Sequence, residues 1–135
     1  VTGKVIGLCH SQRSTERLQK LGFCDYVFSA YATQPVPVLE KIEELTNGEM
    51  CDVTINNVNI TDTEMTRILF TKDTGVVYFF SMATSFTKAA LGAEGVGSDV
   101  MMIVGNGYTK GHAEITLQLL RESPELRKVF TELYA

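Results

Sequence analysis

The sequence lacks several features that would assign it at once to a class of protein. Its 135 residues contain three cysteines and two histidines with no Cys-x-x-Cys pair, which argues against a structural zinc site or a disulfide framework. Acidic residues outnumber basic ones by 16 to 12, so no binding surface for nucleic acid is expected. No apolar run reaches the roughly 20 residues that span a bilayer, and no secretory leader opens the chain. These absences favour a cytoplasmic protein with reduced thiols that binds neither nucleic acid nor membrane.

Short apolar strands alternate with amphipathic helices along the chain. Strands are expected over residues 4–8, 25–29, 52–56, 76–80 and 100–104. Helices are expected from Ser14 or Thr15 to Leu21, over 38–46, from Thr61 or Thr63 to Leu69, and over 111–120 and 124–133, with a loop over 81–98. This alternation predicts an α/β fold, a three-layer Rossmann-like parallel sheet with helices on both faces.

The first expected strand, residues 4–8, reads as the second strand of a dinucleotide-binding fold. In that fold the first strand and the glycine-rich turn that binds the pyrophosphate come about 20 residues earlier. Residues 1–135 are therefore expected to form the rear part of a NAD(P)-binding domain that lacks its first βα unit. Because the absent strand would lie in the centre of the sheet, two unpaired strand edges are expected to favour a homo-oligomer.

The end of the first expected strand is a candidate site for the ribose of the cofactor. An acidic residue commonly accepts hydrogen bonds from the adenosine ribose of NAD at this position. Here the polar segment comprises Cys9, His10, Ser11 and Arg13, without a carboxylate. Ser11 and Arg13 are suited to a 2′-phosphate, which favours tolerance of NADP. The alternative is a solvated turn that precedes a helix.

Two further strand ends are candidates for the nicotinamide half of the cofactor. Residues 56–59 contain three asparagines, and residues 81–83 follow the most strongly β-forming run of the chain. Ligands of open α/β sheets lie outside the carboxyl ends of the strands, where such groups can bond the nicotinamide amide. Asparagine also favours turns, so the alternative for residues 56–59 is a simple change of chain direction.

The remaining candidates are weaker. Glycines at 92–97 and 105–111 suggest phosphate loops. However, no strand is expected directly before the first set, and none is expected after the second. The favoured alternative is that these glycines let the backbone pass close to a ligand. Lys88 is a candidate for a substrate carboxylate, or is simply solvated. His112 is a candidate acid or ligand, or else a surface residue at a helix start. No catalytic triad, carboxylate pair or metal cluster is visible, so the catalytic residues are unknown.

The order of several short motifs resembles the cofactor domain of medium-chain, alcohol-dehydrogenase-like reductases. These motifs are Lys4-Val5-Ile6-Gly7, Glu16-Arg17-Leu18, Leu21-Gly22, Asp25-Tyr26-Val27, Asp52-Val53 and Gly75-Val76-Val77. Residues 79–97, 105–108 and 111–114 are more specific, and they resemble an amino-acid dehydrogenase of bacterial lysine fermentation within that superfamily.

The resemblance implies oxidative deamination of the 3-amino group of a diamino acid, with NAD or NADP as the hydride acceptor. It places the nicotinamide over Val58, Asn59, Ser81, Met82, Ala83 and Asn106, and the adenosine end near Cys9, His10, Ser11 and Arg13. It also implies that the substrate domain lies outside these residues, so that the chain alone is inactive.

Two other readings stay open. Fold does not determine function, so the chain can instead be a non-catalytic nucleotide-binding or regulatory module. It can also be a five-stranded flavodoxin-like domain that is complete as given. In that case the loop over 9–13 would have to bind phosphate without the glycines that are usual there.

Overall fold

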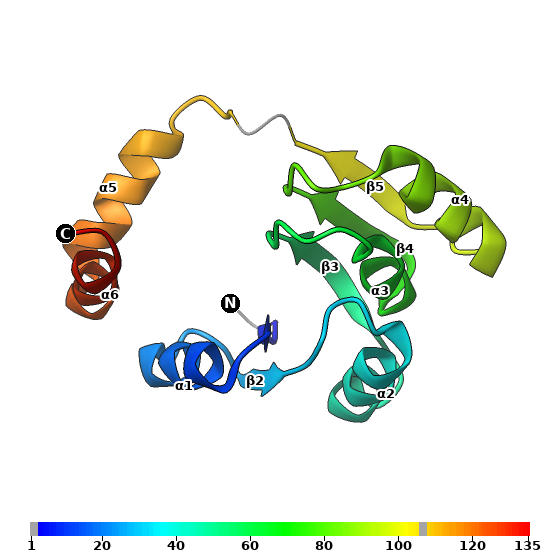
Figure 1. Ribbon diagram of the computed structural model, residues 1–135, viewed down its shortest axis with the longest axis horizontal. Coiled ribbons are helices and arrows are strands. Elements are labelled where there is room, and N and C mark those ends of the chain that lie inside the picture. Colours follow the sequence, from blue (N-terminus) through cyan, green and yellow to red (C-terminus); the bar gives the residue numbers. More distant parts are fainter. Residues whose placement is uncertain (1–2, 106–107) are drawn as a thin grey trace.

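The computed structural model describes residues 3–105 and 108–135, in which strands and helices alternate as expected (Figure 1). The elements are β1 (Ile6–Cys9), α1 (Gln12–Leu21), β2 (Tyr26–Ser29), α2 (Pro35–Thr46), β3 (Cys51–Asn56), α3 (Glu64–Leu69), β4 (Thr71–Phe79), α4 (Phe86–Val96), β5 (Met101–Val104), α5 (His112–Glu122) and α6 (Pro124–Tyr134). The predicted α/β class with parallel strands is confirmed.

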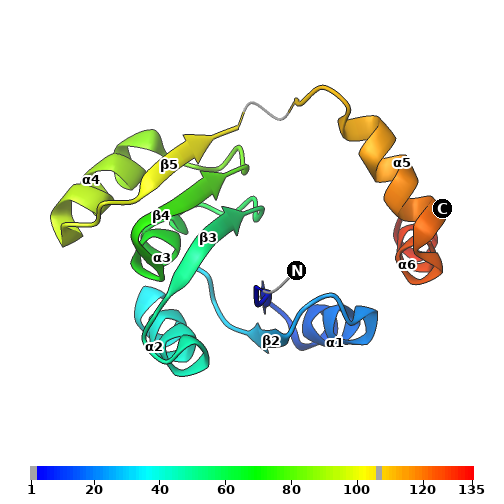
Figure 2. The same ribbon diagram turned by 180° about the vertical axis from the view of Figure 1, so that it is seen from behind.

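The strands form two separate parallel sheets. One contains β1 and β2, and the other has the order β3-β4-β5. In the described residues no ladder joins β1 to β3, and Figure 2 shows the β1–β2 pair beside the larger sheet. A Rossmann-like order would place one strand between β1 and β3. A complete flavodoxin-like sheet would pair β1 with β3, so this alternative is not supported.

Helix α2 connects the two sheets through one apolar core. Val38 and Ile42 on α2 are buried together with Phe70, which follows α3. The partly buried residues packed against this cluster come from both sheets and the segments beside them: Ile6, Leu8, Phe28, Ala30, Leu39, Met50 and Cys51. Prolines at the start of α2 supply the fixed φ that a first helical turn requires. The spacing between the sheets is therefore maintained by side-chain packing rather than by strand pairing.

Helices cover both faces of the β1–β2 sheet, as predicted. Ile6 and Leu8 of β1 contact the α2 core, so the intervening Gly7 faces the other side, because side chains alternate along a strand. A Cβ atom at Gly7 would lie 2.6 Å from Cδ2 of Leu18 on α1. Glycine at this position thus allows α1 to pack closely against β1, opposite α2.

A second core lies under the larger sheet. Val77 and Phe79 of β4 are buried against Ile68 of α3 and against Ala89 and Ala93 of α4. The expected loop over 81–98 is therefore wrong, because residues 86–96 form α4. The alanines let the helix approach the sheet, and this tertiary contact outweighs the low helix propensity of the two glycines within α4. The candidate phosphate loop over 92–97 is excluded, because this segment is helical up to Val96.

Two local expectations also need correction. Ser11, rather than Ser14 or Thr15, caps α1, and its Oγ accepts a hydrogen bond from the Ser14 amide. Strand β4 begins at Thr71, five residues before the expected strand over 76–80, and its register with β3 shifts between Cys51 and Val53. This shift is a bulge in which a Cβ atom at Gly75 would lie within 3 Å of two backbone oxygens.

One face of the larger sheet carries exposed apolar side chains. Val53 and Ile55 of β3 are 59% and 56% exposed, and Met101 and Ile103 of β5 are also exposed. Helices α5 and α6 contact each other, contain no buried residue, and lie apart from both sheets in Figure 1. None of the described helices is long and apolar enough to cross a membrane.

The core under β4 makes a first prediction. Phe79 is fully buried, whereas Phe86 is largely exposed. Phe79→Ala is expected to lower the free energy of unfolding by about 3 to 5 kcal/mol, because it removes a large apolar side chain and leaves a cavity. Phe86→Ala, the matched control, is expected to change it by about 0.5 kcal/mol or less. Urea denaturation measures both values, and equal effects of the two substitutions would contradict this description of the core.

Candidate nucleotide-binding site

The described residues that are predicted to bind the cofactor lie at the carboxyl edge of the sheets. His10 follows β1, Val58 and Asn59 follow β3, and Ser81 follows β4. In parallel α/β sheets the strands end at one edge, and this edge is where ligands bind. Figure 1 shows the loops after β3 and β4 emerging side by side. The structure therefore brings the two proposed halves of a nucleotide site to the same edge.

The segment after β1 combines a thiol, an aromatic contact and a helix cap. Burial raises the pKa of the Cys9 thiol, so this group is protonated at neutral pH. The His10 ring lies edge-on to that of Tyr31, with 5.1 Å between the ring centroids. The Ser11 hydroxyl forms hydrogen bonds with both the amide and the hydroxyl of Ser14. It therefore caps α1. Arg13 is exposed and makes no ion pair within residues 3–105 and 108–135.

A small cavity of about 150 Å³ opens between the ends of β1, β2 and β3. It is lined by Leu8, Cys9, His10, Ala30, Tyr31, Ala32, Thr33, Val58, Ile60 and Arg67. Three predicted residues therefore come together here, namely Cys9, His10 and Val58. The sequence reasoning missed Tyr31, Ile60 and Arg67, which come from the segments after β2 and β3 and from α3. No short-range motif marks these three residues, because the packing of distant segments brings them together.

Asn56 supports the fold rather than pointing toward a ligand. Its side chain is buried, with Nδ2 donating to the Thr63 hydroxyl at 3.0 Å and Oδ1 accepting from Nε of Arg67 at 3.2 Å. Asn56 is thus a structural residue at the end of β3, which neither turns the chain nor faces a ligand.

Asn59 and Ser81 meet across the ends of β3 and β4. The Ser81 hydroxyl donates to Oδ1 of Asn59 at 3.4 Å and accepts from the Ala83 amide at 3.1 Å. Met82, which lies between Ser81 and Ala83 in the chain, is 98% exposed. These contacts arrange polar groups and one apolar side chain at the position predicted for nicotinamide. Asn106, the remaining member of that predicted set, lies outside the described residues.

A buried carboxylate supports the loop that carries Ser81 to Ala83. Oε1 of Glu64 accepts a 2.7 Å hydrogen bond from the amide of Ser85, which is the N-cap of α4. The Ser85 hydroxyl in turn accepts from the Lys88 amide. Glu64 therefore fixes the start of α4 and, with it, the end of the loop.

The two predicted substrate residues lie in different places. Lys88 forms an ion pair with Asp62, which raises the pKa of the Lys88 ammonium. This pair bridges α4 and the loop after β3, the loop that also contains Asn59. Nδ1 of His112 lies 2.7 Å from the Thr109 carbonyl and its ring contacts Tyr108, at the start of α5. The described residues do not bring His112 to the strand ends.

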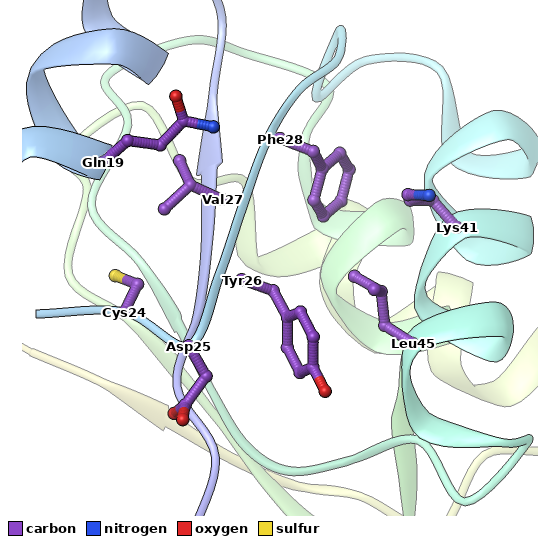
Figure 3. A pocket seen from close by; sticks show the side chains of 8 residues that line it. All are labelled: Gln19, Cys24, Asp25, Tyr26, Val27, Phe28, Lys41 and Leu45. Atoms are coloured by element: carbon purple, nitrogen blue, oxygen red, sulfur yellow. The ribbon is translucent and has the colours of Figure 1, made fainter. Parts of the chain in front are cut away.

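A larger hollow of about 390 Å³ lies beside the outermost strand, β2 (Figure 3). Val27 points toward Gln19 of α1, whereas Tyr26 and Phe28 lie on the side of Lys41 and Leu45 of α2. Because this hollow starts at the amino end of β2, it is not at the edge where nucleotides bind in parallel sheets. No group of three His, Cys, Asp or Glu side chains able to hold a metal occurs in the described parts of the chain.

The parallel sheets and the helices packed against them define a Rossmann-like α/β fold. A solved mycobacterial quinone oxidoreductase superimposes with a TM-score of 0.59 at 15% identity, covering 76% of this chain and 30% of that one. This similarity concerns the fold alone. No family model matches the chain.

The chain is related in sequence to L-erythro-3,5-diaminohexanoate dehydrogenase. It is 57% identical over 133 residues to that enzyme from Acetoanaerobium sticklandii and 52% identical to the one from Fusobacterium nucleatum. Each alignment covers 98% of this chain, which spans 39% of the length of each relative. The resemblance to an amino-acid dehydrogenase is thereby confirmed.

The contact between Glu64 and Ser85 makes a second prediction. Glu64→Ala removes the acceptor for a partly buried amide, so hydrogen exchange at the Ser85 amide is expected to accelerate by about ten-fold, as the loss of one such bond implies. Glu64→Gln keeps an acceptor oxygen and is expected to change this rate much less. NMR-detected exchange measures both rates, and unchanged exchange in Glu64→Ala would show that the carboxylate does not hold the loop.

Proposed function

We propose that the chain forms part of the NAD(P)-binding domain of an oxidoreductase that deaminates L-erythro-3,5-diaminohexanoate to 5-amino-3-oxohexanoate. The observation that carries this proposal is the 57% identity over nearly the whole chain to the enzyme of that name. The cavity and the loop contacts at the carboxyl edge support it, because a dinucleotide needs binding groups at several strand ends. This activity belongs to lysine fermentation and would be cytoplasmic.

The residues present fit the two halves of a nicotinamide dinucleotide. The cavity beside His10 has the apolar walls that an adenine ring requires, and the Asn59–Ser81 contact offers polar groups to a carboxamide. The bound nicotinamide supplies hydride acceptance. Since no carboxylate follows β1 and Arg13 is free of ion pairs in the described residues, a 2′-phosphate is not repelled there, and NADP is accepted as well as NAD.

The substrate would approach from the nicotinamide end. Lys88 lies on α4, directly after the loop that carries Ser81, and its pairing with Asp62 implies that a substrate carboxylate must compete with Asp62. His112 would reach the substrate only through a different position of α5. We assign no catalytic residue to this chain.

The domain itself would be completed by a strand between β1 and β3. Both strands are paired on one side only, both run parallel to their partners, and α2 holds the two sheets next to each other. The exposed face around Val53 and Ile55 would then be covered by a helix that accompanies that strand. An inserted βα unit would also supply the pyrophosphate-binding turn that the described residues lack.

Enzyme assays provide the third prediction. A full-length protein that contains this chain is expected to reduce NAD or NADP in the presence of L-erythro-3,5-diaminohexanoate, whereas the 135-residue chain is expected to be inactive. Absorbance of the reduced nicotinamide measures the rate. Cofactor binding by the full-length protein without reduction, with any diamino acid, would instead support the non-catalytic module.

The unpaired strand edges give the fourth prediction. The 135-residue chain is expected to self-associate, because exposed edges and apolar sheet faces recruit other chains. Light scattering is expected to give a mass above the 14.9 kDa of one chain. A monodisperse 14.9 kDa species with stable helices and strands would contradict the proposal that β1 and β3 lack a neighbour.

A further inference from the structure

Glu64 is a carboxylate that the fold buries at the start of α3. The residue is only 2% exposed, although glutamate is rarely buried to this extent unless a partner is present. Its Oε1 accepts a 2.7 Å hydrogen bond from the amide of Ser85, the N-cap of α4. The positive end of the α4 dipole favours an anion at this position. Glu64 is therefore bound to the start of α4 by a hydrogen bond and by the dipole of that helix.

The Glu64 contact is one of three that join the segment after β3 to the segment after β4. The other two, Asn59–Ser81 and Asp62–Lys88, lie at the surface. Solvent screens an exposed ion pair, so such a pair contributes little to holding two segments together. A hydrogen bond in a buried environment is stronger, because no water competes for the donor and the acceptor. Among these three contacts, the one made by Glu64 restricts the two segments most.

The loop between β4 and α4 depends on contacts at its two ends. At the β4 end, the Ser81 amide donates to the Asn56 carbonyl at 3.2 Å. Within the loop, Met82 is 98% exposed, and the buried hydroxyl of Thr84 has no hydrogen-bond partner among the described residues. A buried polar group without a partner destabilises the segment that carries it. At the α4 end, the bond to Glu64 opposes this effect.

We propose that Glu64 is a positioning residue that fixes the loop over 81–83 for the nicotinamide half of the cofactor. This inference rests on the proposed function, which places the nicotinamide over this loop and over Val58 and Asn59. Glu64 acts through the Ser85 amide and does not touch the cofactor. A ring held between two strand ends needs loops at a fixed separation, and a misplacement of about 1 Å already weakens such a site. The buried contact of Glu64 maintains this separation.

The two halves of the cofactor are expected to respond differently to a change at Glu64. The proposed adenosine end lies after β1, which belongs to the smaller sheet, whereas Glu64 joins segments that follow β3 and β4 of the larger sheet. Loss of the Glu64 contact would therefore weaken binding of the whole dinucleotide and spare binding of its adenosine part. A general loss of stability would weaken both.

Cofactor binding by a full-length protein that contains this chain tests the proposal. Isothermal titration calorimetry would use NADH or NADPH, whichever binds more tightly, and the matching ADP-ribose or 2′-phospho-ADP-ribose, which lacks nicotinamide. Glu64→Ala is expected to weaken the dinucleotide by about ten-fold and the fragment by less than about two-fold, as the loss of one buried hydrogen bond implies. Equal weakening of both ligands, or unchanged binding of the dinucleotide, would overturn the proposal.

Two conservative variants keep the test decisive if Glu64→Ala loses its fold. Glu64→Gln keeps the length and an acceptor oxygen, and it is expected to bind the dinucleotide within about three-fold of the wild type. Glu64→Asp keeps the charge but is too short to reach the Ser85 amide, so it is expected to weaken the dinucleotide selectively. Wild-type affinity in Glu64→Asp would overturn the proposal. The control is Glu125→Ala, which removes an exposed first-turn glutamate of α6 and is expected to change neither affinity.

The two proposals fail in different ways. If the full-length protein reduced NAD or NADP with the diamino acid but Glu64→Ala bound the dinucleotide as tightly as the wild type, only the role of Glu64 would be lost. If Glu64→Ala weakened the dinucleotide selectively but no diamino acid supported reduction, the proposed activity would be lost and the nicotinamide site retained.

Discussion

The packing of α2 across two sheets is the constraint on which the rest of this structure depends. Strand pairing alone would leave β1–β2 and β3–β4–β5 as independent units, because no ladder connects them in the described residues. Val38 and Ile42 bury against side chains from both, so the strand ends remain on one edge. The cavity beside His10 exists because this helix keeps the end of β1 close to the loop after β3.

The local sequence pattern predicted the order of the strands and helices, because the two differ in the spacing of their apolar residues. Gly22 and Asn47 mark helix ends, since both adopt the left-handed conformation there. The local pattern did not predict α4. There the burial of Ala89 and Ala93 under the sheet stabilises the helix despite the low helix propensity of its glycines. At the site, Asn59 and Ser81 could be predicted since each follows a strand. Arg67 could not, because it becomes buried only when α3 packs against the end of β3, where it bonds Asn56, and against the loop after β2, where Thr66 bonds Ala32.

A polar network stabilises the carboxyl edge of the larger sheet. Asn56, Thr63 and Arg67 bond one another at the end of β3, and Glu64 extends this support to the start of α4. Buried polar groups of this kind restrict the loops to one geometry when they are satisfied. Glu64 is bonded to the Ser85 amide, whereas Arg67 also lines the cavity at the ends of β1, β2 and β3.

Amide hydrogen exchange along β1 and β3 tests the central claim most directly, namely that these strands flank the place of an absent neighbour. It would be measured in the 135-residue chain and at the corresponding residues of the full-length relative from Acetoanaerobium sticklandii. The account predicts alternating fast and slow amides in both strands of the short chain, with the fast ones protected in the full-length enzyme. Equal protection in the two proteins would contradict it.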